Sequence, residues 1–305
     1  GSSSSPLPPQ RSSGRSGACR GHTSSVPMAG IGFGASVELP SNEELAKIAQ
    51  VRDACRAEIE ALPSKAADVI GDLRICRFLR SRAGNVQEAT EWFRDFLKWR
   101  VESGIDAQRQ EVIGRTPEDF MRWFDKRRNP YFRLCPYAGR TDDGHVLWFV
   151  HPGYNDPVKF VEHRQVKEEE DERILNLVLE WTMWHLDVLS RTEERMVYCI
   201  KVADFKHLGA GGRKVPIFVP KFKAFFQGMM QKMQKHYCEH DTLFVLLNTS
   251  WLFRTVFSVA KLILTQRQVS KFRILGDASA DDVKKVLSTV VPERLWPAEY
   301  GGPVA

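Results

Sequence analysis

The pattern of apolar and polar positions is most distinctive late in the chain, where a short apolar run precedes a long one. Residues 243–247 are rich in β-branched and aromatic types and too few for an ordinary helix, so they predict a buried strand. Residues 251–264 have the length of a helix and are apolar on nearly every side. Such a helix must be buried in protein, placed against lipid, or both in turn. A second strand is predicted at residues 271–275. Arg254, Ser258 and Lys261 interrupt the long apolar run.

An all-helical unit is predicted before residue 110. Ser41 and Glu44 have the spacing of a capping box, so a helix should begin there and continue to about residue 63. Residues 72–82 have a basic amphipathic pattern, and Asn85 begins another helix that should end at Gly104. The apolar stripe of that helix consists of Trp92, Phe93, Phe96, Leu97 and Trp99.

The periodicity changes after residue 130, where short apolar runs alternate with longer helical patterns. Strands are predicted at residues 131–137, 145–150 and 196–202, a turn at 139–144, helices at 168–191 and 217–235, and a last helix at 280–291. This alternation of strand and helix is typical of an α/β fold.

Composition separates the N-terminal residues from the rest of the 305-residue chain. Residues 1–37 are rich in Ser, Gly and Pro and contain no acidic residue, so they are predicted to be a disordered tail. An Arg- and Ser-rich, acid-poor terminus also fits an organelle transit peptide, which stays the alternative. No stretch of about 18 uncharged apolar residues occurs, so no membrane span is expected.

Positive charge is concentrated in residues 205–276, which carry twelve Lys and Arg against two acids, Glu239 and Asp241. The whole chain has a net charge of only +6. A basic face suits a phosphate-rich surface, either nucleic acid or an anionic membrane. The six cysteines form no CxxC pair, which favours a reduced, intracellular compartment.

Catalytic and cofactor motifs are missing from the sequence. The loop at residues 209–212 is Gly-rich, yet it lacks the GK[ST] ending of a phosphate loop, and no GxSxG, HExxH or GxGxxG motif occurs. We therefore expect no enzyme, no metal and no cofactor. The helix at residues 217–235 is dense in Phe and Met, which indicates either ordinary core or the lining of an adaptable apolar cavity. The candidate lining residues are Phe222, Phe225, Phe226, Met229 and Met230.

Four segments in a fixed order resemble the CRAL-TRIO lipid-binding family, and are most similar to its phosphatidylinositol-transfer-protein branch. They are DLRICRFLRSRAGNVQEATEWFRDFLKWR, the strand at residues 196–202 leading to Asp204, NTSWLFRTVFSVAKLIL, and VPERLWPAEYGG. The resemblance implies a helical N-terminal unit at residues 38–110. It also implies an α/β lipid-binding domain at residues 111–305, with a mostly parallel sheet and an apolar cavity for one lipid. Residues 251–264 would form its gate.

The resemblance also implies a site for a lipid head group. Arg82, Glu239 and Lys271 match the family's inositol-phosphate positions, whereas Ala83 and His240 stand where basic residues are usual. His240 is included as a head-group candidate, although His cannot reproduce the two-donor fork of an Arg. A different head group, or an apolar ligand such as a sterol, tocopherol or retinoid, therefore stays open.

The implied function is intracellular binding and transfer of phosphatidylinositol, phosphatidylcholine or both. A lipid-sensing module without transfer is the alternative. We expect a cytoplasmic monomer that binds a membrane surface transiently and has no nucleic-acid partner. When the gate opens, Trp251, Phe253, Phe257 and Leu264 are expected to face lipid, and Arg254, Lys261 and Arg267 to contact head groups.

Overall fold

The computed structural model describes residue 1 and residues 36–250, 266–276 and 279–303. The chain divides into residues 1–32 and 33–305, and all that follows concerns the second unit. The predicted gate at residues 251–264 and most of the predicted tail lie outside the described residues.

The N-terminal part is helical, as predicted, and its ends are where capping residues place them. The Ser41 side chain accepts a hydrogen bond from the Glu44 amide, and the Glu44 side chain caps Ser41 in return. Asn85 likewise accepts from the Glu88 amide, and Gly104 ends that helix at a φ of 62°. The elements are α1 (Asn42–Ala54), α2 (Arg56–Ala61), α3 (Ala67–Ile70), α4 (Asp72–Ser81), α5 (Val86–Ser103), α6 (Ile105–Gln108), η1 (Arg109–Glu111) and α7 (Pro117–Asp125).

In the described residues, five strands form one sheet in the order β1-β2-β3-β4-β5. β1 is antiparallel to β2, and the three remaining pairings are parallel, which confirms the predicted mostly parallel sheet. Several strand ends differ from the predicted ones by a few residues. The strands are β1 (Leu134–Arg140), β2 (Val146–Val150), β3 (Cys199–Asp204), β4 (Asp241–Leu247) and β5 (Phe272–Ile274).

The turn predicted at residues 139–144 is shorter than expected, because Gly139 belongs to β1. A bulge between Cys135 and Gly139 shifts the register of β1 against β2. Gly139 has a φ of 127°, and a Cβ atom there would lie 2.9 Å from the side chain of Leu295. A glycine is therefore required at this point of the strand.

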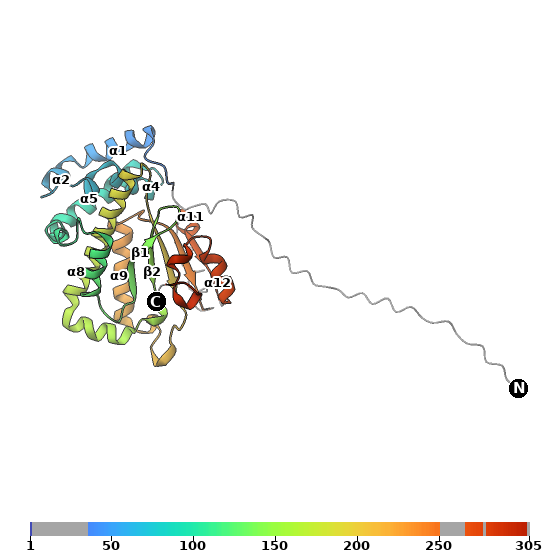
Figure 1. Ribbon diagram of the computed structural model, residues 1–305. Helices are drawn as coiled ribbons and strands as arrows, with labels where there is room; N and C mark the ends of the chain where they lie inside the picture. The colour runs from blue at the N-terminus through green and yellow to red at the C-terminus, as the bar shows by residue number, and fades with distance from the viewer. Residues whose placement is uncertain (2–35, 251–265, 277–278, 304–305) are drawn as a thin grey trace. The chain divides into compact units, whose positions relative to one another are not determined.

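Helices cover both faces of the sheet (Figure 1). α8 (Pro157–Thr192) and α9 (Pro220–His236) pack on one face, and α12 (Ala280–Leu287) packs on the other. α8 begins earlier than predicted, and Lys167 interrupts it with a non-helical φ of −137° directly before the predicted start. The short elements η2 (Pro152–Tyr154), η3 (Ala210–Gly212), η4 (Pro216–Phe218), α11 (Gln266–Ser270), η5 (Glu293–Leu295) and η6 (Ala298–Tyr300) complete the described chain. Among the described helices, none has the length and hydropathy needed to cross a bilayer.

A buried ionic network joins the N-terminal helices to α8. The carboxylate of Glu180 accepts hydrogen bonds from Arg100 at 2.8 Å and from the Tyr237 hydroxyl at 2.8 Å, and it forms a 2.9 Å ion pair with Arg109. Arg100 also binds Asp106, and Arg109 binds Asp68. Burial alone would raise the pKa of Glu180, but the guanidinium charges outweigh it and lower this pKa to about 2.

Replacing Glu180 by Gln should lower the free energy of unfolding by about 3–5 kcal/mol, because it leaves buried guanidinium charge uncompensated. Urea unfolding followed by circular dichroism measures the loss. The matched control, Glu43→Gln, removes an exposed ion pair with Lys47 and should change stability by less than about 0.5 kcal/mol. Equal losses in the two variants would contradict a central role for the network.

Candidate functional site

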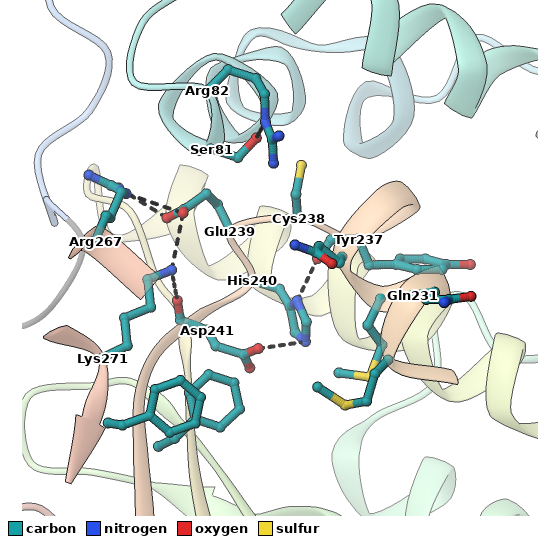
Figure 2. A pocket seen from close by; sticks show the side chains of 15 residues that line it. Ser81, Arg82, Gln231, Tyr237, Cys238, Glu239, His240, Asp241, Arg267 and Lys271 are labelled. Atoms are coloured by element: carbon teal, nitrogen blue, oxygen red, sulfur yellow. Dashed lines mark hydrogen bonds and ion pairs between the residues drawn. The ribbon is translucent and has the colours of Figure 1, made fainter. Parts of the chain in front are cut away.

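A pocket of about 320 Å³ lies where α4, α9, β4 and α11 approach one another (Figure 2). It brings together residues that are far apart in sequence, including all four predicted head-group residues. The lining consists of Ser81, Arg82, Met230, Gln231, Met233, Gln234, Tyr237, Cys238, Glu239, His240, Asp241, Phe244, Arg267, Lys271 and Phe272. Ligand pockets enclose roughly 300–1,000 Å³, so this volume suits one head group rather than a whole phospholipid.

Glu239 is the central anion of the pocket. Its carboxylate accepts from Arg267 at 3.0 and 3.2 Å and forms a 3.1 Å ion pair with Lys271 (Figure 2). The Arg77 guanidinium donates to the Glu239 carbonyl at 2.6 Å and so holds the backbone in place. Burial opposes ionisation of Glu239, but Lys271 and Arg267 lower its pKa below the usual value. Glu239 therefore stays charged and holds two cations beside the cavity.

Arg82 reaches the pocket from the C-terminal end of α4. Its guanidinium lies over the Trp92 ring, 3.6 Å from the ring centroid, and its Nε donates to the Ser81 hydroxyl. Among the described residues, no carboxylate forms an ion pair with Arg82. Stacking positions the guanidinium without neutralising it, so its charge is available to an anion in the pocket.

His240 is buried and held by neighbouring groups of the protein, which gives it a structural role. Its side chain is only 4% exposed, its Nδ1 lies beside the Tyr237 carbonyl, and its Nε2 lies 2.9 Å from Lys201 Nζ. Burial, with the nearby charge of Lys201, lowers the pKa of His240 to about 3. The neutral ring donates from Nδ1 to Tyr237 and accepts at Nε2 from Lys201, so His240 offers no charge to a phosphate.

Lys201 is the functional candidate that the sequence reasoning missed. It lies in β3 and forms a 3.0 Å ion pair with Asp241, which lines the pocket. The available signal was a single cation inside the apolar run at residues 196–202, since burial of a Lys without a partner is rare.

The predicted cavity-lining residues of α9 lie in different places. Phe222 is buried in the core, and Phe225 and Met229 pack against that core. Met230 lines the pocket, whereas Phe226 is 44% exposed at the surface. Assignment of these five side chains to a lipid cavity stays a prediction. The predicted gate residues lie outside the described residues, except Arg267, which lines the pocket.

One group of possible metal ligands occurs among the described residues, namely His151, Asp204 and Glu299. The Asp204 carboxylate already accepts from the Asn248 amide at 2.8 Å and from the Tyr300 hydroxyl at 2.7 Å. Through these bonds Asp204 anchors η6, which contains Tyr300, to the end of β3.

The helical N-terminal part, the mostly parallel sheet and the cationic pocket define an α/β ligand-binding protein. Residues 133–302 match the family model described as the CRAL/TRIO domain. This match covers more than half of the chain, so the protein belongs to the CRAL/TRIO family, as the sequence resemblance indicated.

Several curated proteins are similar over most of the chain. A SEC14 cytosolic factor of Yarrowia lipolytica is 28% identical over 77% of this chain and 44% of its own length. The Sec14 cytosolic factor of Schizosaccharomyces pombe is 24% identical over 82% of this chain and 80% of its own length. The phosphatidylinositol/phosphatidylcholine transfer protein SFH9 of Arabidopsis thaliana is 21% identical, over 85% of this chain and 42% of its own. The chain thus spans less than half the length of two of these relatives.

A solved structure supports the fold independently. The crystal structure of Sfh5 superposes with a TM-score of 0.56 at 15% identity, covering 87% of this chain and 88% of the other. At this identity the likeness establishes the fold alone.

His240 should remain neutral from pH 8 down to about pH 5, because its pKa is lowered to about 3. Nitrogen-15 NMR of the imidazole, assigned with a His240→Gln variant, should show a protonated Nδ1 throughout. The unfolded chain protonates at about 6.5, so this residue lowers stability progressively as the pH falls from 6.5 towards 3. A His240 signal that titrates near pH 6.5 in the folded protein would contradict the assigned contacts.

Proposed function

We propose that this protein binds one phospholipid and transfers it between membranes, the ligand being phosphatidylinositol, phosphatidylcholine or both. The observation that carries the proposal is the pocket lined by Arg82, Arg267 and Lys271, in which Glu239 is the carboxylate paired with Arg267 and Lys271. A phosphate can bind to Arg82 directly and can share Arg267 and Lys271 with Glu239. The family and the names of the relatives support the same ligand class. The proposal requires no catalytic step.

A physical argument explains why such a carrier needs a cavity. Moving about 30 CH₂ groups of two acyl chains through water would cost about 24 kcal/mol, at roughly 0.8 kcal/mol each. Spontaneous desorption is therefore negligible, and the chains must stay covered. We propose that residues 251–264 supply the movable cover, which opens only against a bilayer where its apolar side chains are solvated by lipid.

The surface around the N-terminal end of α9 supports transient membrane docking. Phe218 in η4 is 65% exposed and Phe226 is 44% exposed. Lys214, Lys221 and Lys223 are exposed beside them in a stretch without acidic residues. Each such cation contributes roughly 1 kcal/mol at an anionic membrane surface. Further along α9, by contrast, the side chains of the two lysines are paired: Lys232 with Glu172 and Lys235 with Asp95. This arrangement fits a cytoplasmic protein that associates peripherally with membranes.

Replacing Lys271 by Ala should reduce phosphatidylinositol binding by roughly 10- to 100-fold, since a hydrogen bond to a charged group contributes about 1.5–3 kcal/mol. Binding is measured by mass spectrometry of lipids extracted from the re-purified protein. The matched control is Lys285→Ala, which removes an exposed cation on α12, across the sheet from the pocket. Unchanged phosphatidylinositol binding by a folded Lys271→Ala variant would contradict the head-group site.

Replacing Phe253 and Phe257 together by Asp should abolish lipid transfer between vesicles, because charged side chains on the cover cannot enter a bilayer. The variant should remain folded by circular dichroism. Transfer of labelled lipid from donor to acceptor vesicles gives the rate. A rate equal to that of the original protein would rule out residues 251–264 as the gate, and bound lipid without transfer in the original protein would favour the sensing alternative.

A further inference from the structure

Lys201 lies in a row of aromatic side chains that runs across the sheet. The strand register places Trp148 of β2 opposite Lys201, Lys201 opposite Phe244 of β4, and Phe244 opposite Phe272 of β5. The rings of Phe244 and Phe272 stack with their centroids 4.8 Å apart. Lys201 is thus the single cation in a four-residue row, on the sheet face that α8 and α9 cover.

The Lys201 ammonium is enclosed by groups that attract cations. Its Nζ lies 4.7 Å from the ring centroid of Trp148 and 5.4 Å from that of Phe244. Asp241 carboxylate oxygens lie at 3.0 and 3.2 Å, and the neutral His240 Nε2 lies at 2.9 Å. The residue as a whole is only 6% exposed. Aromatic faces combined with a carboxylate are the groups by which proteins bind quaternary ammonium ligands.

This enclosure adjoins the head-group pocket. Asp241, His240, Phe244 and Phe272 belong to both, because they line the cavity of about 320 Å³ as well as surrounding Lys201 or its aromatic neighbours. A ligand in the pocket therefore meets the outer side of the groups that hold Lys201. Because Lys201 is part of β3, a cationic ligand in the pocket cannot displace its ammonium group as it could displace a free ion.

The charges of the combined site are unbalanced. Four cations, Arg82, Lys201, Arg267 and Lys271, accompany two carboxylates, Glu239 and Asp241. Asp241 is engaged by Lys201, and Glu239 by Arg267 and Lys271. An anionic phosphate is attracted by this excess, whereas a second, cationic group on the same ligand finds no free carboxylate among the described residues of the pocket.

We propose that Lys201 determines head-group specificity by placing its own ammonium in an aromatic and carboxylate enclosure that would otherwise accept choline. The inference rests on the proposed phospholipid-binding function and narrows its ligand. The protein then takes a lipid whose head group is anionic and carries no cation, as in phosphatidylinositol, and excludes phosphatidylcholine. Specificity here comes from a repulsive element rather than from an added contact.

The test measures the ratio of bound phosphatidylcholine to phosphatidylinositol after the full chain is incubated with vesicles containing equal amounts of the two lipids. The lipids are extracted from the re-isolated protein and quantified by mass spectrometry. Replacing Lys201 by Met should raise this ratio at least about tenfold, because the enclosure then offers Asp241 and two rings to choline. The control Lys201→Arg keeps the cation and should leave the ratio within about twofold.

A second variant separates an effect on lipid specificity from an effect on folding. Lys201→Met leaves Asp241 as a buried charge without its partner, which is strongly destabilising. Lys201→Met combined with Asp241→Asn removes both charges. The rings of Trp148 and Phe244 remain and should still raise the ratio of bound phosphatidylcholine to phosphatidylinositol. A folded variant of either kind with an unchanged ratio overturns the proposal, as does an original protein that retains phosphatidylcholine as readily as phosphatidylinositol. An original protein that binds neither phospholipid contradicts the proposed function itself, and this inference with it.

Discussion

The buried carboxylate of Glu180 is the constraint on which the rest of the structure depends. It connects Arg100 of α5 and Arg109 of η1 with the Tyr237 hydroxyl at the end of α9. Tyr237 immediately precedes the segment that carries Glu239, His240 and Asp241, and its carbonyl is bonded to His240. The position of the pocket relative to the N-terminal helices is therefore set by charges that cannot be separated without leaving one of them unpaired in the interior.

In the pocket and beside it, Glu239 and Lys201 are each paired with an ion of opposite charge. Glu239 is paired with two cations, and Lys201 is paired with Asp241 and solvated by a neutral imidazole. Burial raises the pKa of Glu239, but Lys271 and Arg267 outweigh it and lower this pKa, whereas burial itself lowers the pKa of His240. Arg82 differs, because the Trp92 indole face supports it and, within the described part of the chain, no carboxylate pairs with it. The pocket thus combines neutralised cations with one whose charge remains available.

Much of the fold could be predicted from local chemistry. Ser41, Asn85 and Gly104 determine helix ends through contacts within a few residues, so their roles were readable in the sequence. The alternation of strands and helices also indicated the α/β class, whereas the mostly parallel sheet was predicted from the family resemblance. The early start of α8 was missed because Asp156 and Pro157 begin a helix ahead of the acidic run that appeared to start it. The roles of pocket residues such as Glu239 and Lys271 were predicted from the family resemblance. Lys201 was visible in the sequence only as a cation inside a predicted strand. Its role could not be predicted, because its partners lie on other strands and only the register of the sheet brings them together.

The pairing of Glu239 with Arg267 and Lys271 also determines the charge balance of the cavity when no ligand is bound. Two cations held beside an empty cavity would repel each other unless an anion lay between them. Glu239 supplies that anion from the chain itself, so Arg267 and Lys271 keep their counter-charge whether or not a phosphate is bound. In the proposed carrier, departure of a head group therefore leaves neither of these two cations unpaired, and Arg82 is the cation that loses its partner.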